Sequence, residues 1–191
     1  MAQRSTKEIT MGRILVHEFI SLDGVNENPA WTQDYPFDPK MGQTIAGLMG
    51  PGTAILLGRR TYEMFYPVWS KRSAADDPGA PFFNDSQKYV VSGTLQSADW
   101  DNTTIVGGYS ADAIRSLKES VDGDLYVSGS TTLVRAMLAD GLVDELHLFV
   151  FPVALGAGER LFAESDGPLK LGLAGSDAYE SGVVHLGYRP A

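Results

Sequence analysis

The sequence predicts an α/β fold in which a mostly parallel, twisted sheet carries antiparallel strands at its C-terminal end and helices on both faces. Segments with strand character alternate with amphipathic helical segments up to residue 141. The run 54–57 is short and wholly apolar, which is typical of a strand covered on both faces. Beyond Pro152 two strand-like stretches complete the sheet as an antiparallel pair.

The composition is that of a folded domain. A chain of 191 residues with 43% hydrophobic and 20% charged residues buries enough surface for a core without disulfides or metals. No linker, repeat or composition break divides it, so we expect residues 12–191 to form a single domain after a flexible leader, residues 1–11. Because the chain has no cysteine, disulfides, thiolate metal sites and thiol nucleophiles are excluded.

Turn and cap residues mark the elements of the first half. Asp38 and Pro39 supply an N-cap and a favoured first helical residue, and Pro67 is expected to end the helix after Gly58. The segment 70–86 lacks periodicity and is predicted as a long surface loop. The other expected elements are a strand at 13–21, a turn at 21–24 with a loop to 37, a helix at 39–49, a strand at 54–57 and a helix at 59–66.

The second half repeats the alternation and then becomes purely β. Ser110 is expected to cap one helix, and Gly141 to stop the next. The expected elements are strands at 88–92 and 103–106, a helix at 111–121, a strand at 125–128, a helix at 130–140, a long strand at 143–151 and antiparallel strands at 169–174 and 183–189.

The charge balance limits the partners. Fifteen basic against 24 acidic residues give a net charge of −9, which repels nucleic acids and anionic membrane surfaces at long range. Neither is an expected partner. The sequence shows no signal peptide or membrane span, so a cytoplasmic location is expected. An anionic ligand would need a local cluster of hydrogen-bond donors.

Such a cluster is predicted after the strand 125–128. Gly129, Ser130, Thr131 and Thr132 open a helix there, and the first N–H groups of a helix lack intrahelical partners and favour negative charge. The glycine lets a ligand approach the backbone, and the hydroxyls add donors, as a pyrophosphate requires. The alternative is structural: Ser130 caps the helix, and the glycine serves strand–helix packing.

A second turn of this kind follows the strand 54–57. Gly58, Arg59, Arg60 and Thr61 place two guanidinium groups at a strand end, and arginine presents forked donors that match phosphate oxygens. Adjacent arginines cannot share one helical face, so one of them is expected to face a ligand. The alternative is a solvated surface pair.

Common fingerprints are missing from the sequence. It contains neither G-x-G-x-x-G nor G-x-x-x-x-G-K-[ST], so neither a dinucleotide-binding Rossmann domain nor a P-loop is supported. His17, His147 and His185 are far apart in the chain and show no metal-ligand spacing. We expect structural or surface roles for them and no metal site.

Six segments follow one another in a recognisable order: 20–24 (Ile-Ser-Leu-Asp-Gly), 56–63 (Leu-Leu-Gly-Arg-Arg-Thr-Tyr-Glu), 88–95, 125–138, 141–146 and 151–158. Together they resemble the dihydrofolate-reductase-like superfamily. The resemblance is strongest to the reductase domain of the riboflavin-pathway deaminase–reductase and its stand-alone bacterial relatives, and it covers residues 12 to about 162.

The resemblance implies NADPH bound across the C-terminal ends of the strands. The turn after Gly58 then holds the cofactor's 2′-phosphate through Arg59, Arg60 and Thr61, with help from Ser92 at the matching end of another strand. The segment Gly129, Ser130, Thr131 and Thr132 corresponds to the pyrophosphate loop, and the turn 21–24 to the segment that closes over the nicotinamide.

One departure separates the chain from true folate reductases. These place an acid on the first long helix, paired with a threonine on the later long strand. Here the strand position corresponds to Phe149, and the helix begins with Asp38 as its cap. Folate is therefore not the expected substrate.

Hydride transfer to a C=N or C=O group is helped by a proton donor. Asp23 is the first candidate, because its turn lies beside the nicotinamide in the resembling fold, although Asp-Gly is also favourable turn chemistry. Alternation along the first strand makes His17 a second candidate, as a proton relay. The side chains expected to line the substrate pocket, unless the aromatic ones are ordinary core, are Ser21, Trp31, Asp38, Tyr66, Trp69 and Phe149.

The resulting hypothesis is an NADPH-dependent oxidoreductase that transfers a hydride to a small heterocyclic, pteridine- or pyrimidinone-like, or carbonyl substrate. The alternative is a non-catalytic NADP(H)-binding or sensor protein on the same fold, which the missing folate-type acid favours. We also expect a homodimer, because an exposed sheet edge such as 183–188 needs covering and the resembling family pairs.

Overall fold

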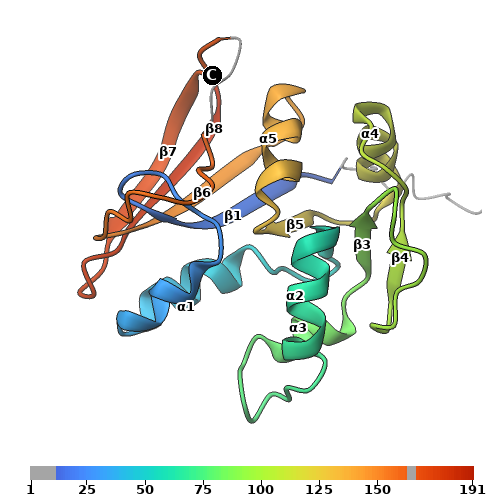
Figure 1. The fold of residues 1–191 in the computed structure, drawn as a ribbon, viewed down its shortest axis with the longest axis horizontal. Coiled ribbons are helices and arrows are strands. Elements are labelled where there is room, and N and C mark those ends of the chain that lie inside the picture. The colour runs from blue at the N-terminus through green and yellow to red at the C-terminus, as the bar shows by residue number, and fades with distance from the viewer. Residues whose placement is uncertain (1–11, 163–166) are drawn as a thin grey trace, which may run out of the picture.

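The computed structural model describes residues 12–162 and 167–191; the expected leader, residues 1–11, lies outside them. Its strands form one sheet in the order β4-β3-β2-β5-β1-β6-β8-β7 (Figure 1). The strands are β1 (Ile14–Ser21), β2 (Ala54–Gly58), β3 (Lys88–Val91), β4 (Thr103–Ile105), β5 (Leu125–Ser128), β6 (Glu145–Phe151), β7 (Leu171–Ala178) and β8 (Val184–Pro190). The helices are the 3₁₀ helix η1 (Pro29–Asp34) and α1 (Pro39–Gly47), α2 (Arg59–Trp69), α3 (Ala80–Asp85), α4 (Ala111–Ser120) and α5 (Thr131–Ala139).

The strand directions confirm the predicted fold class. From β4 to β6 all neighbouring strands are parallel, whereas β8 runs antiparallel to both β6 and β7. The parallel part needs crossover helices, which the strand–helix alternation of the sequence supplies. The carboxyl ends of β1, β2 and β5 consequently meet at one edge of the sheet.

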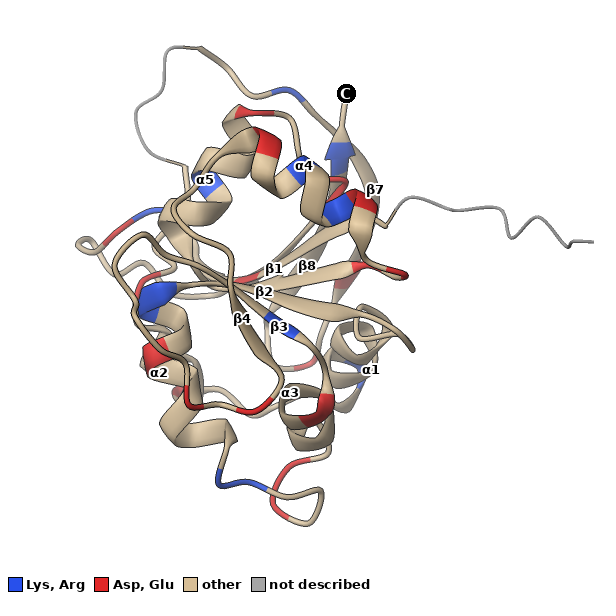
Figure 2. Ribbon diagram, turned by 90° about the vertical axis from the view of Figure 1, so that its right-hand side faces the viewer, with Lys and Arg blue, Asp and Glu red and all other residues tan. Residues whose placement is uncertain are grey.

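Helices cover both faces. Figure 2 shows α4 and α5 on one face and α1, α2 and α3 on the other. Strand alternation divides the apolar side chains between these two layers. In β1, Ile14, Val16 and Ile20 pack in the core under α4 and α5, whereas Leu15 packs in the core under α2 and α3. By the same alternation, Glu18 belongs to the α4–α5 side.

The segment 70–86 is not the uninterrupted loop that its lack of periodicity predicts, because it contains the helix α3. Six residues are too few to show a helical period, and tertiary contacts stabilise the helix instead. Ala80 and Phe83 are buried. The ammonium group of Lys88 is fully buried and donates to the carbonyls of Phe83, Asn84 and Ser86 at 2.9, 3.1 and 2.8 Å.

Pro67 does not end α2, which continues to Trp69. The proline removes one backbone hydrogen bond, but continuing the helix stacks Trp69 on Phe83 with ring centroids 4.1 Å apart. The helix ends instead at Ser70, whose N–H and hydroxyl both donate to the Tyr66 carbonyl. In the predicted loop before residue 37, η1 is a further element that the sequence does not indicate.

The predicted segment 183–188 is not an edge of the sheet; the two edge strands are β4 and β7. That segment lies largely in β8, which is paired on both sides. β7 is exposed along nearly its whole length, and 61% of Leu173 is accessible. None of the helices in the described part of the chain is long and apolar enough to cross a membrane.

Candidate functional site

A cavity of about 260 Å³ opens where β1, β2 and β5 end. Its volume is close to the lower end of the range for small-molecule sites, roughly 300–1,000 Å³. Carboxyl ends of parallel strands are the usual place for ligands in open α/β sheets. The lining residues come from the end of β1 and the loop after it, the starts of α2 and α5, and the segment before residue 160: Glu18, Phe19, Asn26, Glu27, Asn28, Pro29, Arg60, Thr61, Met64, Phe65, Gly129, Ser130, Thr131, Thr132 and Glu159.

The two predicted phosphate turns lie side by side at this cavity and are bonded to each other. The Ser130 hydroxyl oxygen accepts from the Gly58 N–H at 2.8 Å, and the hydroxyl donates to Thr61 Oγ1 at 2.8 Å. Gly129 and Ser130 both have left-handed backbones, with φ of 67° and 70°. A Cβ on Gly129 would stand 3.4 Å from Thr61 Cγ2. This distance is an ordinary van der Waals contact, so it is the left-handed backbone that favours glycine at position 129.

The Ser130 side chain does not make the cap hydrogen bond that the structural alternative expected, and it joins the start of α5 to the start of α2 instead. Its side chain makes no cap hydrogen bond, because the hydroxyl is engaged with Gly58 and Thr61. The cap residue of α2, Gly58, has no side chain to offer either. Two helix N-termini that lack side-chain caps thus adjoin one cavity, and both favour an anion. The donor set fits phosphate groups.

The two adjacent arginines point in different directions, as expected for neighbours on a helix, and only one of them faces the cavity. Arg60 lines the cavity, whereas Arg59 does not. The Arg59 guanidinium is half-exposed and forms an ion pair with Glu63 at 3.1 Å, one turn along α2. Any contact of Arg59 with a phosphate requires exchange of this partner.

Ser92 lies at the end of β3 and is not among the lining residues. Its hydroxyl oxygen accepts from the N–H groups of Thr94 at 3.2 Å and Leu95 at 2.9 Å. The side chain therefore closes its own turn and is buried there, in contrast to the predicted cofactor contact.

Asp23 is not the proton donor that its position in the turn suggests. Its carboxylate accepts from the Ser21 hydroxyl at 2.7 Å and from the N–H groups of Leu155 and Gly156 at 3.0 and 2.8 Å. These hydrogen bonds hold the pKa of Asp23 far below its usual range. It is ionised at neutral pH and, together with Ser21, ties the turn at 21–24 to the segment after β6.

His17 does not reach the cavity either. The ring is buried, and its Nδ1 lies 2.7 Å from the Tyr126 hydroxyl. Burial, reinforced by His147 and His185, lowers the pKa of His17 to about 3, so the ring is neutral at physiological pH. The histidines that are distant in sequence meet across β1, β6 and β8, with His147 Nδ1 and His185 Nε2 3.0 Å apart. Among the described residues, no group of side chains suited to a metal ion was found.

None of the six side chains predicted for the substrate pocket lines the cavity. The aromatic ones belong to the core, as the alternative interpretation held. Tyr66 and Trp69 pack from α2 against the core cluster below it, Trp31 packs against Phe151, and Phe149 is fully buried. Asp38 caps α1 by accepting from the Lys40 N–H at 2.8 Å. The Ser21 hydroxyl donates to Asp23 within the turn at 21–24. The apolar part of the lining comes instead from Phe19, Met64 and Phe65.

Glu18 is the site residue that the sequence analysis did not select. It lines the cavity but is only 2% exposed. Its Oε2 accepts from Asn26 Nδ2 at 3.1 Å, and Oε1 is buried without a hydrogen-bond partner. Burial raises the pKa of Glu18 to about 8. The available signal was a single carboxyl in β1, a mostly apolar strand whose other polar residues are His17 and Ser21.

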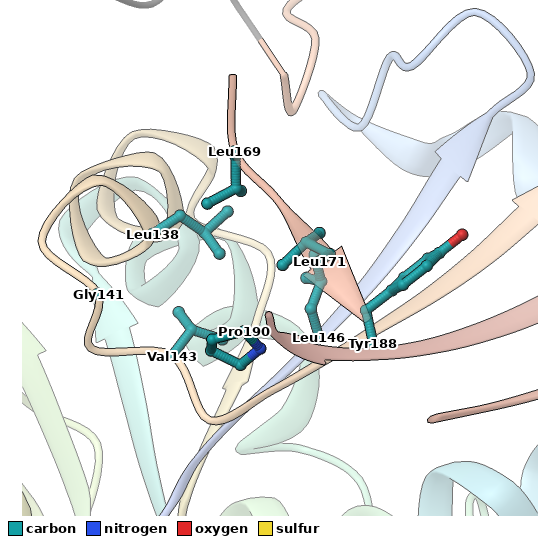
Figure 3. A pocket seen from close by; sticks show the side chains of 8 residues that line it. All are labelled: Leu138, Gly141, Val143, Leu146, Leu169, Leu171, Tyr188 and Pro190. Carbon is teal, nitrogen blue, oxygen red and sulfur yellow. The ribbon is translucent and has the colours of Figure 1, made fainter. Parts of the chain in front are cut away.

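A second, smaller cavity lies between α5 and the antiparallel strands (Figure 3). Its lining is aliphatic except for Tyr188, whose hydroxyl points away from the cluster around Leu138. Because it offers no charged group, this cavity provides neither acid–base chemistry nor phosphate recognition.

The sheet order and the cavity at its carboxyl edge define a dihydrofolate-reductase-like α/β protein. A family model described as the RibD C-terminal domain matches residues 13–185, and the chain therefore belongs to this family of reductase-type domains. The chain is 26% identical over 186 residues to the uncharacterized protein YyaP of Bacillus subtilis (strain 168), covering 96% of this chain and 97% of YyaP.

Solved structures support the same fold. A Shewanella sp. PV-4 protein described as a candidate riboflavin biosynthesis protein superposes with a TM-score of 0.76 at 22% identity, covering 94% of this chain and 99% of that one. Dihydrofolate reductase from Enterococcus faecalis, solved with NADP(H), superposes with a TM-score of 0.57 at 13% identity, covering 94% and 96%.

Proposed function

We propose that the protein is an NADPH-dependent reductase that transfers a hydride to a small heterocyclic, pteridine- or pyrimidinone-like, or carbonyl substrate. The observation that carries the proposal is the shared cavity of two helix N-termini without side-chain caps and one arginine, Arg60, in a chain of net charge −9. The free N–H groups of the helix starts and the guanidinium of Arg60 suit phosphate groups, and they share the cavity with the carboxyl groups of Glu18, Glu27 and Glu159. Family membership supports a reductase.

In this proposal the starts of α2 and α5 hold the phosphates. The first N–H groups of α5 and the hydroxyl of Thr132 suit the pyrophosphate, and the guanidinium of Arg60 suits the 2′-phosphate. The Thr131 hydroxyl already donates to Asn26 Oδ1. When bound, the reduced nicotinamide supplies a hydride. Phe19, Met64 and Phe65 give the cavity an apolar wall against which a flat ring can pack.

The test is a titration with NADPH and NADH, followed by nicotinamide fluorescence. We expect NADPH to bind more tightly, and Arg60→Ala to weaken NADPH binding about 10- to 100-fold while changing NADH binding little, because a charged hydrogen bond to phosphate contributes roughly 1.5–3 kcal/mol. Arg59→Ala should have the smaller effect, since Arg59 already pairs with Glu63. Arg115→Ala removes an exposed arginine of α4 that pairs with Asp112 and serves as the matched control.

Equal affinity for both cofactors, unchanged by Arg60→Ala, would refute the phosphate assignment. Turnover is tested separately, by following NADPH absorbance with pteridines, pyrimidinones and quinones as acceptors. A protein that shows the NADPH preference but oxidises no cofactor with any of these acceptors is instead an NADP(H)-binding or sensor protein.

A further inference from the structure

We infer that Glu18 is the acid that gives a proton to the substrate in the reductase proposed above. The inference rests on that function and adds a residue to it. It starts from an unusual placement: a carboxyl group at the C-terminal part of the central strand β1, in the lining of the cavity, only 2% exposed and with Oε1 free of any hydrogen-bond partner.

Only one of the two carboxyl oxygens of Glu18, Oε2, is held by a hydrogen bond. Oε2 accepts from Asn26 Nδ2 at 3.1 Å, and Asn26 Oδ1 accepts in turn from the Thr131 hydroxyl at 3.1 Å. This chain of hydrogen bonds links the carboxyl to the first turn of α5, the element assigned to the cofactor phosphates. Burying a carboxyl oxygen without a hydrogen-bond partner raises the free energy of the folded protein. A ligand group that accepts a hydrogen bond or a proton from Glu18 would remove this penalty.

The surroundings favour the neutral carboxyl. No ion pair reaches Glu18 in the described part of the chain, and the polar partner it has is an uncharged amide. The other titratable groups that face the site are Glu27, Glu159 and Arg60 in the lining and Tyr126 on the neighbouring strand β5. Glu159 is paired with Arg135 at 2.9 Å. Burial, the main cause, raises the pKa of Glu18 to about 8.

The chemistry requires such a group. When a C=N or C=O bond is reduced, its carbon receives a hydride and its nitrogen or oxygen receives a proton, and the reduced nicotinamide is left as NADP⁺. Glu18 supplies the proton from its O–H, becomes a carboxylate, and regains a proton from water after the product leaves. Asp23 and His17 cannot do this at neutral pH, because the first is ionised and the second carries no extra proton.

The first measurement needs neither cofactor nor substrate. Infrared spectra of the wild type at pH 7 should contain the C=O band of a protonated carboxylic acid, which fades as the pH rises through about 8. Glu18→Gln should lack this band. Glu119→Gln changes an exposed glutamate of α4 and should retain it. A wild-type spectrum without the band at pH 7 overturns the inference.

The second measurement is single-turnover hydride transfer from NADPH to a dihydropterin and to phenanthrenequinone. Glu18→Gln should bind NADPH as the wild type does but transfer hydride about 10²- to 10³-fold more slowly. The wild-type rate should fall at pH above about 8, and the residual rate of the variant should not. A variant that keeps both the rate and the pH profile, with NADPH binding intact, overturns the role of Glu18 alone. A wild type that binds no NADPH or transfers no hydride overturns the proposed function as well.

Discussion

The buried carboxyl of Glu18 should make the stability of the folded protein depend on pH. Burial raises its pKa from 4.5 in the unfolded chain to about 8 in the fold. Below pH 4.5 both states carry the proton, and the contribution of the carboxyl to stability is fully present. As the pH rises toward 8 the unfolded chain releases the proton while the folded protein keeps it. Stability therefore falls with rising pH, and Glu18→Gln should abolish this fall.

The magnitude follows from proton linkage. Between pH 5 and pH 7 the wild type should lose about 2.5 kcal/mol of unfolding free energy relative to Glu18→Gln. With a urea dependence of roughly 2 kcal/mol per molar, the difference corresponds to a relative shift of about 1 M in the unfolding midpoint. His17, whose pKa is lowered to about 3, destabilises both proteins as the pH falls below 6.5. Its effect cancels in the comparison.

Urea unfolding of both proteins at pH 5, 6 and 7, followed by circular dichroism, measures the effect. Only the difference between the pH slopes of the two proteins matters, so a pH-independent cost of the amide substitution cancels. Stability curves that run parallel within about 0.5 kcal/mol would show that Glu18 titrates normally. The carboxyl would then be ionised at neutral pH, and its assignment as a proton donor would fail.

Two further predictions concern α3 and the sheet edge. Lys88→Met should lower the unfolding free energy by about 2–4 kcal/mol, because one buried and two partly buried carbonyls lose their donor. Denaturation compared with that of the exposed Lys71→Met variant checks this, and equal stability of the two variants contradicts it. We also propose that the protein is a homodimer paired through β7, whose Leu173 is 61% exposed. Light scattering should give about twice 20.6 kDa for the wild type and a monomer for Leu173→Asp, and a monomeric wild type removes the proposal.

Local features of the chain determined much of the fold. The predicted strand–helix alternation, the Asp38 cap and the two turns after β2 and β5 all appear where the sequence places them. Each depends on residues that are adjacent or one helical turn apart, so the physical causes are contained in short stretches. A segment that depends on distant contacts was missed. The helix α3 is stabilised by the packing of Phe83 against Trp69 and Tyr126, and it is too short to show a helical period in the sequence.

The candidate site divides in the same way. Glycines, hydroxyls and arginines at strand ends are visible in the sequence, and they indicated the phosphate turns. That Ser130 bonds to Gly58 rather than capping α5, and that Asp23 is held ionised by Leu155 and Gly156, depends on strands brought together by the sheet order. The sequence by itself thus determined which residues we propose for an anion. Only the tertiary structure decided which carboxyl keeps its proton, because protonation depends on solvent exclusion and on partners from other elements, as the contrast between Asp23 and Glu18 shows.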